Sequence, residues 1–148
     1  MTRHFESAEA LEAFGVRLAA VAHAGDVIAL YGDLGAGKTT LARGLLRGLG
    51  LAGEAPSPTF TLVQTYDPPE VRVPVWHCDL YRLDDPEDAI ELGLDEAFDT
   101  ALVLIEWPER LGDFLPRDAL RLRLDGAGET QRRLTAEVPP GWEARWPS

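Results

Sequence analysis

The residues of this sequence best suited to chemistry form one run, Gly32-Asp33-Leu34-Gly35-Ala36-Gly37-Lys38-Thr39-Thr40. The run fits the phosphate-binding pattern G-x-x-x-x-G-K-[ST] at every fixed position. Glycines in such a loop let backbone N–H groups turn toward phosphate oxygens, and a following helix adds positive potential at its N-terminus. Lys38 would reach the β- and γ-phosphates, and Thr39 would offer its hydroxyl to Mg²⁺. The expected nucleotide-binding residues are Gly32, Gly35, Ala36, Gly37, Lys38, Thr39 and Thr40.

Lysine occurs only at Lys38, whereas the other thirteen of the fourteen basic residues are arginine. A compact ammonium fits among phosphate oxygens where the broad guanidinium does not, so the exception favours a phosphate site. The flanks agree, because the apolar stretch 27–31 precedes the loop as a buried strand and 41–47 follows it with helical spacing. The alternative is a glycine-rich turn between strand and helix that binds no ligand.

Two carboxylates end apolar stretches that are typical of strands, Asp79 after 71–78 and Glu106 after 101–105. Phosphate-loop enzymes place their metal-binding and γ-phosphate chemistry at such strand ends. We therefore expect Asp79 to be catalytic together with Lys38, although a helix cap or a partner for Arg82 is the alternative. Glu106 is expected to meet Mg²⁺ with Thr39, directly or through water.

Two aromatic neighbours of these acids are open to two interpretations. Trp107 follows the expected metal ligand, so a place beside the nucleotide and a place in the core are equally consistent with its position. His77 shares a strand face with Asp79 and Tyr81 in an extended stretch. For His77 we favour a strand histidine with internal partners over a catalytic role.

The remaining patterns predict one α/β domain, residues 1–148, with a mixed, mainly parallel sheet flanked by helices and two antiparallel hairpins. Ser7 is expected to cap a helix that runs to about Ala22. Asp85 and Pro86 begin another helix, whose acidic residues form a solvated face. The tryptophans of the tail 139–148 either pack on the domain or face a partner. The expected hairpins pair 59–66 with 71–79 and 120–124 with 132–138.

Composition limits the classes of partner and compartment. The net charge of −11 disfavours unaided binding to RNA or DNA, whose phosphates such a surface repels. The single cysteine, Cys78, excludes an internal disulfide and suits a reducing cytoplasm. Neither a signal peptide nor a membrane-spanning run is present in the sequence, so we expect a cytoplasmic protein.

Taken together, these motifs resemble the bacterial TsaE (YjeE) ATPases, which have the P-loop NTPase fold and serve in making threonylcarbamoyladenosine in tRNA. The resemblance extends from about Phe5 to Val138. Its more specific parts are Ser57-Pro58-Thr59-Phe60, His77-Cys78-Asp79-Leu80-Tyr81-Arg82-Leu83 and Glu106-Trp107-Pro108. Cys78 departs from the apolar or aromatic residue that the family often has there.

The resemblance implies that the loop and Lys38 hold ATP, that Thr39 and Glu106 hold Mg²⁺, and that Asp79 acts in hydrolysis. It further implies that Trp107 lies near the nucleotide and that 57–59 responds to it as a switch. Members of the family are weak ATPases alone and act with TsaD and TsaB, so tRNA would be reached only through that complex. We expect a monomer in isolation.

Three other functions are compatible with a phosphate loop. A small-molecule kinase needs an arginine-rich lid and an acceptor pocket, and the arginines here are scattered. A guanine-specific switch needs Asn-Lys-x-Asp, which a chain without asparagine does not contain. A nucleotide-sensing scaffold without turnover uses nearly the same residues as an ATPase, and the sequence leaves it open.

Overall fold

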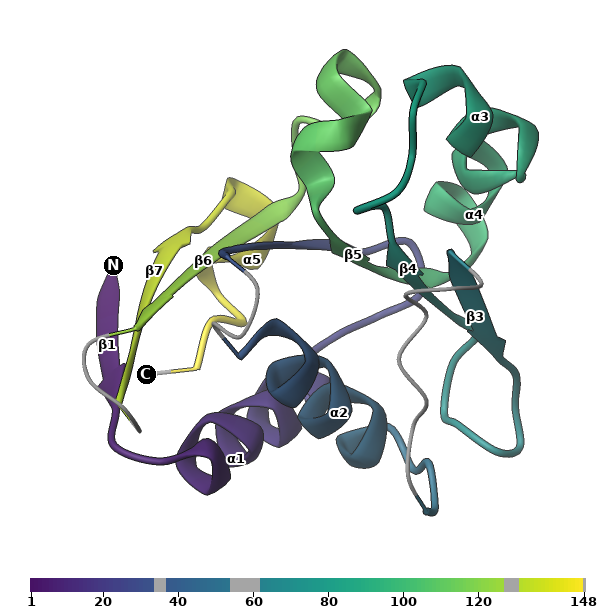
Figure 1. Ribbon diagram of the computed structural model, residues 1–148. Coiled ribbons are helices and arrows are strands. Elements are labelled where there is room, and N and C mark those ends of the chain that lie inside the picture. The colour runs from purple at the N-terminus through teal and green to yellow at the C-terminus, as the bar shows by residue number, and fades with distance from the viewer. Residues whose placement is uncertain (34–36, 54–61, 127–130, 148) are drawn as a thin grey trace.

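The computed structural model describes residues 1–33, 37–53, 62–126 and 131–147 (Figure 1). Seven strands form one sheet in the order β1-β7-β6-β2-β5-β4-β3. The strands are β1 (Thr2–Phe5), β2 (Val27–Tyr31), β3 (Val63–Tyr66), β4 (Val75–Asp79), β5 (Leu102–Glu106), β6 (Leu120–Gly126) and β7 (Arg132–Glu137).

The middle of the sheet is parallel and its margins are antiparallel. β2 pairs in parallel with β5 and β6, and β5 pairs in parallel with β4. β3 joins β4 as one antiparallel hairpin, β7 joins β6 as another, and β1 pairs with β7. Five strands therefore point the same way, which confirms the mixed, mainly parallel α/β architecture.

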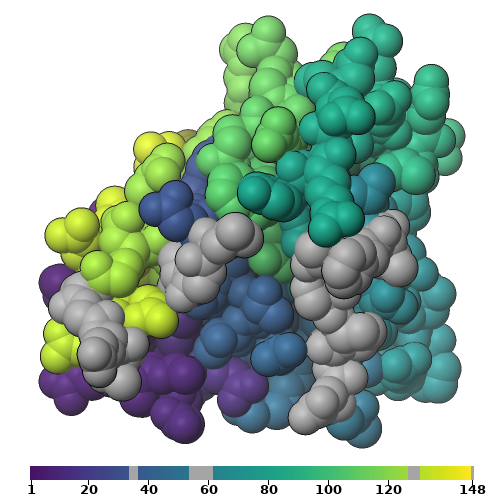
Figure 2. All heavy atoms as spheres, viewed as in Figure 1, coloured from purple at the N-terminus to yellow at the C-terminus, as the bar shows by residue number. Residues whose placement is uncertain are grey.

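Helices cover both faces of the sheet. α1 (Ala8–Ala19) and α2 (Lys38–Gly48) lie together on one face. The short helices α3 (Pro86–Glu91) and α4 (Leu94–Thr100) lie on the other face with the 3₁₀ segment η1 (Pro108–Phe114), drawn in green (Figure 1). In the space-filling view, blue residues of α2 reach the surface between purple residues of α1 and the green and teal residues above (Figure 2). Among the described residues, no helix is long and apolar enough to cross a membrane.

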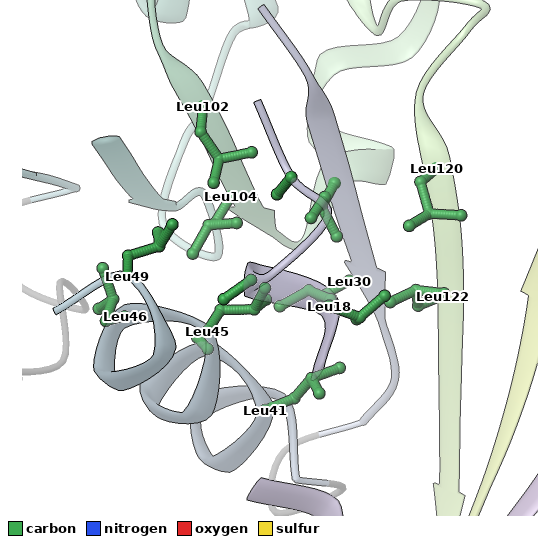
Figure 3. Close-up of a cluster of buried hydrophobic side chains, with 14 of the residues drawn as sticks. Leu18, Leu30, Leu41, Leu45, Leu46, Leu49, Leu102, Leu104, Leu120 and Leu122 are labelled. Carbon is green, nitrogen blue, oxygen red and sulfur yellow. The ribbon is translucent and has the colours of Figure 1, made fainter. Parts of the chain in front are cut away.

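The core between α2 and the sheet is built from leucines (Figure 3). Leu41 and Leu45 of α2 point toward Leu30 of β2, as their spacing of four residues on a helix requires. These side chains are fully buried. Every residue of β5 is buried as well, which explains why the four residues before Glu106 are all apolar rather than alternating with polar ones.

Glycines let α1 and α2 approach more closely than side chains would allow. A Cβ atom placed on Gly44 would lie 2.2 Å from the carbonyl oxygen of Glu12, and one on Gly15 would lie 2.6 Å from that of Leu41. Because these neighbours are backbone atoms, no side-chain rotation relieves the overlap. The two glycines therefore let α2 pack at a short, fixed distance from α1.

Several boundaries differ from the sequence predictions. Ser7 caps α1 as expected, but the helix ends at Ala19 rather than near Ala22. The strand expected from Val71 begins only at Val75, since Pro74 breaks the pattern before it. The strand expected over 59–66 begins at Val63, and 59–61 lie outside the described residues.

The positions of the two ends of the chain are determined by tertiary contacts. β1 was not predicted, because four residues of alternating burial give a weak pattern and its partner β7 is far away in the sequence. In the tail, the short helix α5 (Pro140–Glu143) buries Trp142 in the core. Trp146 packs edge-on against Phe14 of α1, with ring centroids 5.7 Å apart. The tail tryptophans thus pack on the domain.

The contact between α1 and α2 predicts that Gly44→Ala is destabilising. Although alanine is the better helix former, its methyl group would force the two backbones apart, and we expect the free energy of unfolding to fall by about 1–3 kcal/mol. Thermal unfolding followed by circular dichroism measures the effect. Gly141→Ala is the matched control, because a Cβ atom there meets nothing within 4 Å. Equal melting temperatures for the two variants would contradict the close approach.

Candidate functional site

The carboxyl ends of three parallel strands meet beside the N-terminus of α2. In the register of the sheet, Glu106 at the end of β5 lies between Leu30 of β2 and Asp79 of β4. Parallel α/β sheets bind ligands at this edge. Lys38 and Thr39 begin α2 directly after Gly37, whose φ of 106° is a left-handed conformation that glycine adopts without strain. The topology thus brings together the residues that the sequence placed in three separate motifs.

Lys38 is buried although it carries a charge, with 4% of its surface exposed. Its Nζ donates a 2.5 Å hydrogen bond to the carbonyl oxygen of Gly32 and lies 3.7 Å from the centre of the Trp107 ring. Burial lowers the pKa of Lys38, and nearby carboxylates, led by Glu106 and then Asp79, oppose that shift. The ammonium is thus held by a carbonyl oxygen and an aromatic face. Phosphate oxygens are charged and would be stronger partners for it than either of these.

Trp107 is fixed by its backbone and by a second ring. Its φ of 60° and ψ of 50° are uncommon for a residue with a side chain, and they turn the chain from β5 into η1. The Tyr81 ring lies 4.9 Å away, centroid to centroid, and is 39% exposed. The indole therefore lies at the site, over Lys38, while part of it also packs against the cluster under α3 and α4.

Glu106 connects Thr39 to His77. One carboxylate oxygen, Oε1, accepts a long 3.4 Å hydrogen bond from the Thr39 hydroxyl. The other, Oε2, lies 2.7 Å from Nε2 of His77. The side chains of Glu106 and His77 are almost wholly buried, at 4% and 1% exposure. The hydroxyl and the carboxylate predicted to share a metal ion are therefore neighbours.

Asp79 ends β4 and is also buried. Its Oδ1 accepts a 3.0 Å hydrogen bond from the backbone N–H of Tyr81, and its own backbone N–H donates to Leu62. The carboxylate thus stabilises the turn that follows the strand as well as facing the same edge as Glu106. It does not cap a regular helix; Asp85 caps α3 instead, through a 3.0 Å bond from the Glu87 N–H.

The other predicted site residues fall into two groups. Gly32 and Gly37 are in place at the two ends of the loop, and Thr40 lies half-buried in the first turn of α2. Gly35 and Ala36 lie outside the described residues, as does the expected switch 57–59.

Two further residues lie at the site, and the sequence did not predict their contacts there. His77 was interpreted as a strand histidine with internal partners, and the structure shows that its partner is Glu106. Arg132 of β7 also approaches the site, because its Nε lies 3.7 Å from where a Cβ atom on Gly37 would be. The sequence signals for His77 were a face shared with Asp79 and its place in the motif 77–83. Nothing in the sequence places Arg132 near a residue that precedes it by ninety-five positions.

Cys78 has no part in this edge of the sheet. It is fully buried in the cluster on the opposite face from His77, among residues of α3, α4 and β5. Burial raises the pKa of its thiol from 9.0 to about 12. The residue that departs from the family pattern thus serves as a small apolar filler.

Comparison with known proteins gives consistent matches. A family model described as threonylcarbamoyl adenosine biosynthesis protein TsaE matches residues 5–134. The tRNA threonylcarbamoyladenosine biosynthesis protein TsaE of Bacillus subtilis is 39% identical over 128 residues, which are 86% of this chain and 78% of that protein. The protein of the same name from Streptomyces coelicolor is 41% identical over 134 residues, or 89% and 90% of the two chains. The crystal structure of Bacillus subtilis YdiB matches with a TM-score of 0.83 at 33% identity, over 98% of this chain and 90% of that one.

The buried thiol gives a pH-dependent prediction. In the unfolded chain Cys78 ionises above pH 9.0, whereas in the folded protein it stays protonated to about pH 12. The unfolded state then binds fewer protons, so stability falls as pH rises through this window. Relative to Cys78→Ala, the wild type should lose about 1.4 kcal/mol per pH unit above pH 9. Urea unfolding at several pH values measures this difference, and a thiol reagent at pH 8 should label Cys78 only after unfolding. Rapid labelling of the folded protein would contradict its burial.

Proposed function

This chain belongs to the TsaE family, and from that premise we propose that it is a Mg²⁺-dependent ATP-binding protein and slow ATPase of tRNA threonylcarbamoyladenosine biosynthesis. The observation that carries the proposal is the buried Lys38 at the start of α2, beside the carboxylates of Asp79 and Glu106. A buried cation with two flanking acids at the carboxyl edge of a parallel sheet is the arrangement that phosphoryl chemistry needs.

In this proposal Lys38 binds the β- and γ-phosphates of ATP. Its present partners, the Gly32 carbonyl and the Trp107 ring, are neutral, so anionic oxygens would be stronger acceptors for its ammonium. Backbone N–H groups at the start of α2 add donors and the positive end of the helix dipole. The family resemblance supports ATP as the nucleotide that is bound and ADP as the product of its hydrolysis.

The pair Thr39 and Glu106 fits a magnesium ion. Mg²⁺ prefers oxygen ligands and is commonly held by one or two protein side chains together with substrate phosphates and water. A hydroxyl and a carboxylate oxygen 3.4 Å apart, one from α2 and one from β5, supply such a pair. Bound there, the ion would neutralise charge on the phosphates. Among the described residues, no cluster of three or more His, Cys, Asp and Glu side chains is arranged to hold a metal.

For hydrolysis we assign Asp79 to the attacking water. Its carboxylate is fixed by the Tyr81 N–H and lies at the end of β4, next to Glu106 in the sheet. An ionised acid held in this way can accept a hydrogen bond from water and orient it for attack. Lys38 would stabilise the charge that develops on the transferred phosphoryl group. With only these groups and no arginine assigned to the γ-phosphate, slow turnover is expected.

The partners we propose are TsaD and TsaB, with tRNA contacted only through their complex. A chain with a net charge of −11 repels RNA, so a role in tRNA modification calls for other proteins to hold the RNA. The acidic residues of α3 and α4 are exposed, as expected for a solvated face. The proposed role places the protein in the cytoplasm.

Nucleotide binding is tested by Lys38→Ala. Loss of a charged hydrogen bond to phosphate should weaken ATP binding about 10–100-fold, which calorimetric titration measures. Arg43→Ala is the matched control, because it removes a positive charge from an exposed position of the same helix. Unchanged affinity in Lys38→Ala would exclude the loop as the phosphate site.

Turnover is tested by Asp79→Ala, with phosphate release measured for the protein alone and then with TsaB and TsaD. We expect slow turnover in the wild type that changes when the partners are added. In the variant turnover should fall by about a hundredfold while ATP affinity stays within about threefold. Asp99→Ala, an exposed acid of α4, is the control.

Each alternative function gives a different result in these assays. Loss of ATP binding in Asp79→Ala would assign Asp79 to structure or to metal binding. Binding without turnover, with or without the partners, would favour a nucleotide-sensing scaffold. Turnover that ignores TsaB and TsaD but rises with a small-molecule acceptor would favour a kinase.

A further inference from the structure

The imidazole of His77 has one described partner, the carboxylate that is proposed to hold Mg²⁺. We propose that His77 is a positioning residue that fixes the orientation of Glu106, so that Oε1 faces Thr39 and the metal ion. The inference rests on the proposed function, because it assigns a role within that same site. It goes further by giving a histidine that is not among the proposed nucleotide or metal ligands control over the affinity for Mg²⁺.

The register of the sheet makes the contact possible. β4 and β5 lie side by side (Figure 1), with His77 opposite Leu104 and Asp79 opposite Glu106. His77 and Glu106 are therefore diagonal neighbours on one face, a separation that two long side chains can bridge. The resulting distance of 2.7 Å between Nε2 and Oε2 is that of a strong, charge-assisted hydrogen bond.

The two oxygens of Glu106 are thereby given different tasks. An ionised carboxylate only accepts hydrogen bonds, so Nε2 of His77 carries the proton and donates it to Oε2. Oε1 is left toward Thr39, at 3.4 Å from its hydroxyl. Without the imidazole, rotation about the last side-chain bond of Glu106 would turn the plane of the carboxylate, so that neither oxygen would be held toward Thr39. Binding the metal would then also require this rotation to be stopped.

The environment of His77 indicates that the residue is not there for stability. Its side chain is buried, and its second nitrogen, Nδ1, has no hydrogen-bond partner in the part of the chain that the structure describes. A buried polar atom without a partner costs free energy, and an apolar side chain of similar size would avoid that cost. Among the described residues, the imidazole therefore makes one hydrogen bond, and its partner is Glu106. Partners of metal-binding residues typically contribute 10–100-fold to metal affinity.

The test compares His77→Met with His77→Gln. The two replacements are unbranched and nearly equal in length, but only glutamine has an N–H that can replace Nε2. Binding of a fluorescent ATP analogue is measured at increasing Mg²⁺ and in EDTA. In His77→Met the Mg²⁺ concentration for half-maximal binding should rise about 10–100-fold, while affinity in EDTA stays within about twofold. His77→Gln should restore much of the response.

Val75→Ala is the matched control for a buried change in β4 that leaves the bond to Glu106 intact. An unaltered Mg²⁺ response in folded His77→Met would overturn the inference, and so would an equal loss in Val75→Ala. If the wild type itself binds ATP without regard to Mg²⁺, the proposed function fails together with the inference. If ATP binding responds to Mg²⁺ in the same way in the wild type and in His77→Met, the inference about His77 is wrong but the proposed function stands.

A measurement on the wild type keeps the test independent of how the variants fold. The chain has three histidines, and His4 and His23 are exposed. In nitrogen-15 spectra of the imidazole groups, adding Mg²⁺ to the ATP-bound protein should shift the Nε2 signal of His77 and leave the other two unmoved. Absence of a shift at His77 while Mg²⁺ strengthens ATP binding would overturn the inference.

Discussion

The site depends on one alignment of strands, in which Glu106 at the end of β5 is held in register between Leu30 of β2 and Asp79 of β4. Because side chains alternate along a strand, a slip of one residue would turn Glu106 and Asp79 to the opposite face of the sheet. In β5 that register is fixed by the four apolar residues that precede Glu106, all of which are buried. The hydrophobic core thus sets the positions of the charged groups at its edge.

The second constraint is the place of α2. Its leucines anchor it to the sheet, and its glycine contact with α1 sets how far it lies from the first helix. Lys38 and Thr39 take their positions from this packing, since they occupy the first turn of the same helix. A rigid helix start allows a hydroxyl from α2 and a carboxylate from β5 to converge.

The electrostatics of the site follow from burial. Lys38 is a buried cation beside carboxylates in a chain with a net charge of −11. Because its ammonium is removed from water, the neutral Gly32 carbonyl and Trp107 ring stabilise it less than an anionic partner would. The ring of Trp107 lies over the ammonium at 3.7 Å and helps to shield it from water. A buried cation of this kind would favour an anionic partner, even though the protein as a whole repels anions.

The sequence by itself determined the class of fold, the strand that precedes Lys38 and the helix that begins at it, and the two acids that end β4 and β5. These are local patterns, in which spacing and residue type carry the physical information within a few positions. It did not reveal β1 or the bond from His77 to Glu106, and it left open where the tail tryptophans lie. Each of these depends on pairing between segments far apart in the chain, or on which neighbour a buried side chain meets. Only the tertiary structure decided them, because the free energy of such contacts comes from the packing of the whole domain rather than from the sequence around each residue.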